Sequence, residues 1–123
     1  MITTIQRVEN VALTAMIFVA FVHFGFPWWT LFGMFLVYDL SALAYLKDAR
    51  VGAVAYNLVH NYTAPALLGL LYLFLSAADQ PAWALGFIAG TWGFHVAVDR
   101  ALGYGLKLTS GFQDTHLGRI GRK

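Results

Sequence analysis

Long apolar runs alternate with short polar breaks along the chain. Four runs can be drawn, over residues 8–26, 28–46, 51–75 and 82–103. The breaks that separate them fall at Pro27, residues 47–50 and residues 76–81. Each run is about 19 to 25 residues long, and an α-helix needs roughly 20 residues to cross the hydrocarbon core of a bilayer. The pattern therefore predicts four helices joined as hairpins.

The composition favours a membrane over a soluble core for these helices. Hydrophobic residues make up 59% of the 123-residue chain and charged residues 11%, whereas soluble domains carry about 25% charged residues. We expect an all-α, integral membrane four-helix bundle over residues 1–103, in contact with membrane lipid, and a basic, glycine-rich polar tail over residues 104–123. The absence of cysteine excludes disulfides and thiolate metal ligands. The net charge of +2 is too small to favour a nucleic-acid partner.

The basic residues predict the orientation of the helices. With the N-terminus in the cytoplasm, every lysine and arginine falls on the cytoplasmic side, and the two outer loops contain none. These residues are Arg7, Lys47, Arg50, Arg100, Lys107, Arg119, Arg122 and Lys123. Because cytoplasmic loops are enriched in Lys and Arg, we expect a multi-pass protein of the bacterial cytoplasmic (inner) membrane with both termini in the cytoplasm.

Four ionisable side chains are expected at one depth in the bundle. Counting about 1.5 Å per helical residue from the cytoplasmic boundary places Asp39, His60, His95 and Asp99 at similar levels in the inner leaflet. His95 and Asp99 are four residues apart, so both project from one face of their helix. Ionisable residues inside a membrane are costly, usually face the bundle interior and mark functional sites. The sequence therefore predicts one shared polar centre.

Two imidazoles and two carboxylates favour a metal centre. This set suits zinc, iron or manganese, and helix bundles build metal sites from facing helices. We expect His60, His95 and Asp99 as ligands, with Asp39 as a fourth ligand or as a catalytic general base. A structural hydrogen-bond network without metal stays open as the alternative. Haem between the histidines is less favoured, because carboxylates beside a porphyrin are costly to keep charged.

Further polar residues are expected around this centre. The candidates on the helices are Glu9, Tyr38, Asn57, Asn61 and Arg100. Asp114 and His116 are the candidates in the tail, for which there are two interpretations. Either the tail is a solvated terminus that its basic residues hold near anionic lipid, or it folds back as a lid and Asp114 or His116 completes the site.

Gly86 and Gly90 form a GxxxG pattern in the fourth run. Small residues let helices approach closely within a membrane. The pattern therefore predicts either a homodimer through these glycines or close packing inside one chain.

Four sequence blocks carry a resemblance to a known family. They are YDLSALAYL (38–46), VGAVAYNLVHNY (51–62), HVAVDRALGYGLK (95–107) and GFQDTHLGRIG (111–121). Together they resemble the small bacterial membrane proteins of domain-of-unknown-function family 4260. The resemblance names no reaction, but it implies that the recurring blocks hold Asp39, Asn57, His60, His95, Asp99 and His116. A weaker likeness is to seven-helix membrane hydrolases such as the alkaline ceramidases, which carry HxxxH where this chain has HxxxD.

These features lead to one functional expectation and two alternatives. We expect metal-dependent hydrolysis of a lipid-like substrate at a centre in the inner leaflet. The first alternative is a small transporter or proton-relay module that uses the same histidines and aspartates. The second is a structural subunit of a larger membrane complex, in which the polar cluster only joins the helices.

Overall fold

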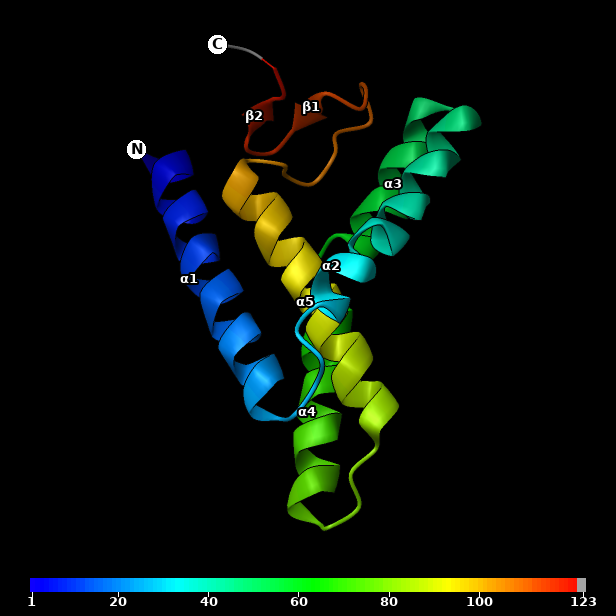
Figure 1. Ribbon diagram of the computed structural model, residues 1–123. Helices are drawn as coiled ribbons and strands as arrows, with labels where there is room; N and C mark the ends of the chain where they lie inside the picture. Colours follow the sequence, from blue (N-terminus) through cyan, green and yellow to red (C-terminus); the bar gives the residue numbers. More distant parts are fainter. Residues whose placement is uncertain (122–123) are drawn as a thin grey trace.

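The computed structural model describes residues 1–121 and consists of helices with one small hairpin (Figure 1). Arg122 and Lys123, which the predicted orientation also uses, lie outside the described residues. The helical elements are α1 (Ile2–His23), α2 (Thr30–Gly33), the 3-10 helix η1 (Phe35–Leu46), α3 (Ala49–Val59), α4 (Thr63–Ala77) and α5 (Trp83–Leu102). The strands are β1 (Asp114–Thr115) and β2 (Gly118–Arg119). Within the described chain the predicted all-α bundle is confirmed, with α2 continuing into η1 and α3 followed closely by α4.

The last helix, α5, lies in the middle of the bundle and has two different faces (Figure 1). α1 and α4 pack on one face, which carries Gly86, Gly90 and Gly93 at spacings of three and four residues. η1 contacts α5 on the other side and pairs closely with α3. His95 and Asp99 lie about half a helical turn around from the glycines, so they face η1 and α3.

Aromatic side chains of the same chain fill the space over two of these glycines. A Cβ on Gly86 would lie 2.6 Å from the ring of Phe26 and 2.8 Å from that of Tyr72. A Cβ on Gly90 would overlap the ring of Phe21. Both glycines therefore allow close packing within one chain, and the homodimer contact through them stays a prediction.

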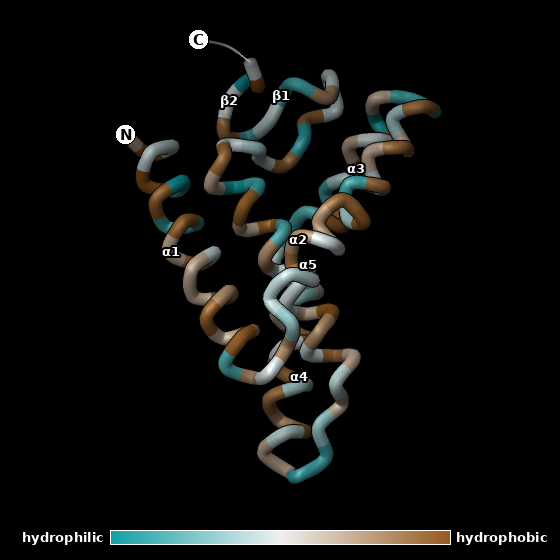
Figure 2. The backbone as a smooth tube through the Cα atoms, viewed as in Figure 1, coloured by the Kyte–Doolittle hydropathy of each residue, from teal (hydrophilic) through white to brown (hydrophobic). Residues whose placement is uncertain are grey.

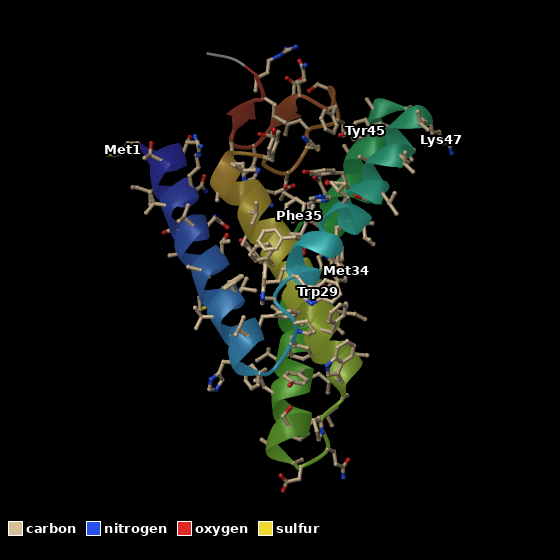
Figure 3. The ribbon with its side chains drawn as sticks, in the orientation of Figure 1. Met1, Trp29, Met34, Phe35, Tyr45 and Lys47 are labelled. Carbon is tan, nitrogen blue, oxygen red and sulfur yellow. The ribbon has the colours of Figure 1, made fainter. Side chains whose placement is uncertain are left out.

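The second apolar run differs from the single helix predicted over residues 28–46, because it begins as α2 and continues as η1. A 3-10 helix has three residues per turn, so side chains three apart lie in one row. Phe35 and Tyr38 form such a row, and their rings lie 4.3 and 5.5 Å from the ring of His95 on α5. Figure 3 shows Phe35 beside α5. Asp39 follows in the next row, within reach of the end of α3.

The third apolar run is interrupted between α3 and α4, whereas the sequence predicts one helix over residues 51–75. An interruption leaves carbonyls that a continuous helix would pair. Trp92 donates its indole N–H to the carbonyl of Val59 at 2.6 Å, and Arg100 donates to the carbonyl of His60 at 3.0 Å. Two side chains of α5 therefore compensate for the break and hold it against the centre of the bundle.

Two helical segments are long and apolar enough to cross a membrane. They are Ile2–His23 and the combined α3–α4 segment Ala49–Ala77, while the apolar segment Thr30–Leu46 is shorter. Large apolar side chains are exposed along α1 and α4, where Figure 2 shows hydrophobic stretches. Met1 and Lys47 lie at the same end of the molecule as the C-terminal hairpin (Figure 3). This gathering of the basic segments agrees with the predicted orientation, which itself stays a prediction.

Residues 104–121 fold back over the end of the bundle (Figure 1). Gly103 ends α5 in a left-handed conformation with φ of 97°, which suits glycine and turns the chain into the tail. β1 and β2 pair antiparallel, with Asp114 opposite Arg119. Side chains from α3 and α5 hydrogen-bond to the tail. The tail is therefore folded against the bundle and connects α3 to the end of α5 (Figure 1).

Candidate metal centre

Four residues from three parts of the chain bring their ligand atoms together. Asp39 comes from η1, His60 follows α3 directly, and His95 and Asp99 come from α5. One ligand atom of each lies within 4.8 Å of the others. Both histidines and Asp99 are buried, whereas the side chain of Asp39 is 40% exposed. The structure thus gathers the four predicted ligands around one point that opens on the Asp39 side.

The ligand atoms lie within 4.8 Å of one another, and the distances that involve the two histidine nitrogens are close to those around a tetrahedral ion. Nε2 of His60 and Nε2 of His95 are 2.9 Å apart. Oδ1 of Asp39 lies 3.4 and 3.5 Å from these two nitrogens, and Oδ2 of Asp99 lies 3.5 and 3.7 Å from them. Ligands about 2.0 to 2.1 Å from a tetrahedral ion lie roughly 3.3 Å from one another. The four side chains can therefore hold a metal ion between them.

Tyr56 orients two of the four ligands. Its carbonyl oxygen lies 3.0 Å from Nδ1 of His60, so an Nδ1–H donates there and leaves the Nε2 lone pair for the centre. Its hydroxyl donates to Oδ2 of Asp99 at 3.0 Å, and its ring stacks on the His60 imidazole at 3.6 Å. Such outer contacts fix the tautomer and orientation of metal ligands. Tyr56 is absent from the predicted site residues, although its four-residue spacing from His60 signals the contact.

His95 is enclosed by aromatic side chains and has one unpaired ring nitrogen. Phe35 and Tyr38 cover its ring, and its buried Nδ1 has no hydrogen-bond partner within residues 1–121. Because Nδ1 of His60 already donates to a carbonyl, the contact between the two Nε2 atoms requires His95 to donate from Nε2 when no metal is bound. If Nε2 of His95 bound a metal ion, the ring proton of His95 would lie on Nδ1 instead. The same geometry thus serves a metal centre or a metal-free network.

Four other predicted residues surround the centre without being among its ligands. They are Tyr38, Asn57, Asn61 and Arg100. The hydroxyl of Tyr38 shares a 2.8 Å hydrogen bond with that of Thr91 on α5. Asn61 donates to carbonyls in the last turn of α3, while Asn57 and Arg100 connect α3 and α5 to the tail. These contacts fix the elements that carry the ligands.

Glu9, Asp114 and His116 do not belong to the ligand group of the described chain. Glu9 is exposed on α1, and Asp114 hydrogen-bonds with Ser110 inside the tail. Nε2 of His116 lies 3.1 Å from the guanidinium of Arg100. Burial and this guanidinium lower the pKa of His116, which favours its neutral form. The tail covers the end of the bundle as the lid interpretation expects, but neither tail residue completes the ligand set.

The fold and the site define an all-α helical bundle with a buried histidine–aspartate cluster that can hold a metal ion. The model of the family described as Domain of unknown function (DUF4260) matches residues 3–120, and the chain belongs to this family. The resemblance of the four sequence blocks is thereby confirmed. No curated protein and no solved structure matches the chain. The family description names no activity.

Proposed function

We propose that this protein is a metal-dependent hydrolase of the bacterial cytoplasmic membrane that acts on a lipid-like substrate. The ligand geometry carries the proposal, because two nitrogens and two oxygens lie within 4.8 Å of one another. The spacings of 2.9 to 3.7 Å that involve the nitrogens are close to those around a tetrahedral ion. Such a mixed set suits zinc, iron or manganese. Haem is disfavoured, since Nε2 atoms 2.9 Å apart leave no room for a porphyrin between His60 and His95.

The four ligand residues have different roles in this proposal. His60, His95 and Asp99 are buried and hold the ion, while Tyr56 keeps two of them oriented. Asp39 lies on the exposed side, where water and substrate have access, and acts as fourth ligand or as general base. When bound, the ion supplies the Lewis acidity that hydrolysis requires.

A membrane location accounts for the apolar surface of the bundle. α1 and the α3–α4 segment have the length and composition of spans, and many of their large apolar side chains are exposed in the described part of the chain. We place all four helical segments in the bilayer with both termini in the cytoplasm, because basic residues gather at that end. The centre then lies in the inner leaflet, where a lipid headgroup can approach Asp39 laterally.

Metal content tests the proposal most directly. Elemental analysis and an absorption spectrum of the detergent-purified full chain should show a near-stoichiometric transition metal and no Soret band. The His60→Ala/His95→Ala double variant should lose the metal and keep its helical content. His23→Ala, at the C-terminal end of α1, is the matched control and should keep the metal. Purified wild-type protein that contains no metal would contradict the proposal of a metal-dependent hydrolase.

A proton relay is the second candidate, and the direct imidazole contact favours it. Nε2 of His95 lies 2.9 Å from Nε2 of His60, and Oδ2 of Asp99 lies 3.5 Å from the same His60 nitrogen. Metal-free wild-type protein that carries protons across liposomes, with loss of transport in Asp99→Asn, would support this relay. If the protein neither binds metal nor moves protons, the cluster is structural, and His60→Ala should lower thermal stability alone.

A further inference from the structure

Lys107 is a buried cation in the folded tail. The residue is 3% exposed, and its Nζ has no hydrogen-bond partner within the part of the chain that the structure describes. Its Nζ lies 3.8 Å from the ring centroid of Phe112, 4.7 Å from that of Tyr56 and 5.9 Å from that of Tyr104. Cation–π contacts stabilise the charge, but they leave the N–H donors of the ammonium without acceptors. The three rings therefore enclose a charged donor group.

Tyr56 connects this ammonium to the candidate metal centre. Its ring is one wall around Lys107, and its hydroxyl donates to Oδ2 of Asp99. The backbone of Lys107 is fixed as well, because the side-chain amide of Asn57 pairs with both its N–H and its carbonyl. The side chain of Tyr56 thus contacts both the Lys107 ammonium and the candidate ligand Asp99.

Charge balance at a metal-loaded centre favours an additional anion. The carboxylates of Asp39 and Asp99 together neutralise a divalent ion. Lys107 and Arg100 then remain as cations, and among the described residues neither has a carboxylate within 4.0 Å. The uncompensated Lys107 ammonium attracts a phosphate dianion more strongly than a singly charged carboxylate.

We infer that Lys107 binds a phosphate group of the substrate, which makes the substrate a phosphate-bearing amphiphile. The inference rests on the proposed hydrolytic function and specifies its substrate class. A phosphate oxygen accepts hydrogen bonds from the Lys107 ammonium, and the rest of the molecule extends toward the exposed side of Asp39. Phe112 covers the ammonium but is itself 46% exposed, so its ring moves aside when the phosphate binds.

Calorimetric titration of the metal-loaded, detergent-purified full chain tests this inference, with inorganic phosphate and a short-chain phosphatidic acid as probes. Lys107→Met should weaken binding at least about tenfold, which corresponds to about 1.4 kcal/mol, without loss of metal. Lys107→Arg keeps the charge and should retain most of the affinity. Lys47→Met, on the exposed turn before α3, is the matched control and should bind like wild type. Phe112→Ala should bind more tightly, because it uncovers the ammonium.

Equal affinity of Lys107→Met and wild type would overturn the inference, as would metal-loaded wild type that binds neither probe. If Lys107→Met does not fold, Phe112→Ala decides: tighter binding supports the subsite, and unchanged affinity overturns it. Binding of phosphatidic acid alone supports a lipid headgroup as the source. Equal binding of both probes supports free phosphate and overturns the amphiphilic substrate.

The inference and the hydrolase proposal can fail separately. If wild-type protein contains no metal but still binds phosphate through Lys107, the anion subsite is supported and only the metal centre is contradicted. Metal-loaded wild type without phosphate binding retains the metal centre and loses the subsite.

Discussion

The side-chain amide of Asn57 forms two hydrogen bonds with the backbone of Lys107, one of 2.9 Å to its carbonyl and one of 2.6 Å from its N–H. Asn57 lies on α3 and Lys107 in the tail, 50 residues further along the chain. An amide that pairs with both backbone groups of one residue fixes that residue as a neighbouring strand does. The tail is therefore attached to α3 at Lys107, the residue that carries the buried ammonium.

Replacing Asn57 with leucine should loosen this attachment. Leucine has a similar volume but leaves the N–H and carbonyl of Lys107 without partners, and an unsatisfied buried group costs about 1–3 kcal/mol. We expect a comparable loss in the free energy of unfolding and faster cleavage of the tail in limited proteolysis. Thr109→Leu, at an exposed tail position, is the control and should change neither. A tail that resists protease equally in both variants would count against the attachment.

Tyr56→Phe should weaken metal binding without removing the aromatic wall. The variant keeps the ring that stacks on His60 but loses the hydroxyl that donates to Asp99. Loss of such an outer contact typically costs about 10- to 100-fold in metal affinity, measurable by competition with a chelator. Tyr38→Phe is the matched control, since its hydroxyl bonds to Thr91 instead. Equal affinities in the two variants would mean that Tyr56 does not position Asp99.

The stability of the protein should rise with pH between about 8 and about 10.5. Burial lowers the pKa of Lys107 from 10.5 to about 8, although Asp99 and Asp39 oppose the shift. Between these values the unfolded chain binds more protons at this lysine than the folded chain does, so a higher pH favours folding. Thermal unfolding in detergent should show this rise in wild type and a flatter profile in Lys107→Met. Because Tyr56 and Tyr104 remain in both proteins, a profile shared by both would exclude Lys107 as its cause.

Gly90→Ala should destabilise the packing of α1 on α5. The added methyl overlaps the ring of Phe21, and overpacking of this kind costs about 1–3 kcal/mol. Gly69→Ala is the control, because its nearest neighbour would lie at an ordinary 3.8 Å and alanine favours a helix over glycine. Thermal unfolding measures the difference. Light scattering on the same samples tests the homodimer, since a change of mass in Gly90→Ala without loss of stability would indicate an intermolecular contact.

The gathering of the four ligand residues could be predicted from the sequence because it depends on few assumptions. Helical spacing puts His95 and Asp99 on one face whatever the surroundings. The depth counted from the charged boundary places Asp39 and His60 level with His95 and Asp99. This placement holds even though the helix with Asp39 is 3-10 and α3 ends just before His60. An apolar segment also has few other polar groups with which these side chains could pair.

The break after α3 and the folded tail could not be predicted in the same way. Their partners are distant in sequence: Trp92 lies 33 residues from the carbonyl of Val59 that it satisfies, and Lys107 lies 50 residues from Asn57. Periodicity describes only neighbours within a few turns. The burial of Lys107 likewise depends on a distant ring, that of Tyr56, in addition to Tyr104 and Phe112 of the tail itself. From the sequence alone, a lysine in a basic, glycine-rich segment is expected to be exposed to solvent.

The two faces of α5 give the molecule a modular construction. Gly90 supports the packing of α1 on one face, and Asp99 belongs to the ligand group on the other, about 13 Å further along the helix. Changes at such separated positions should add in free energy without coupling. The packing of α1 can therefore be altered without moving Asp39, His60, His95 and Asp99, which α3, η1 and the C-terminal half of α5 hold in place.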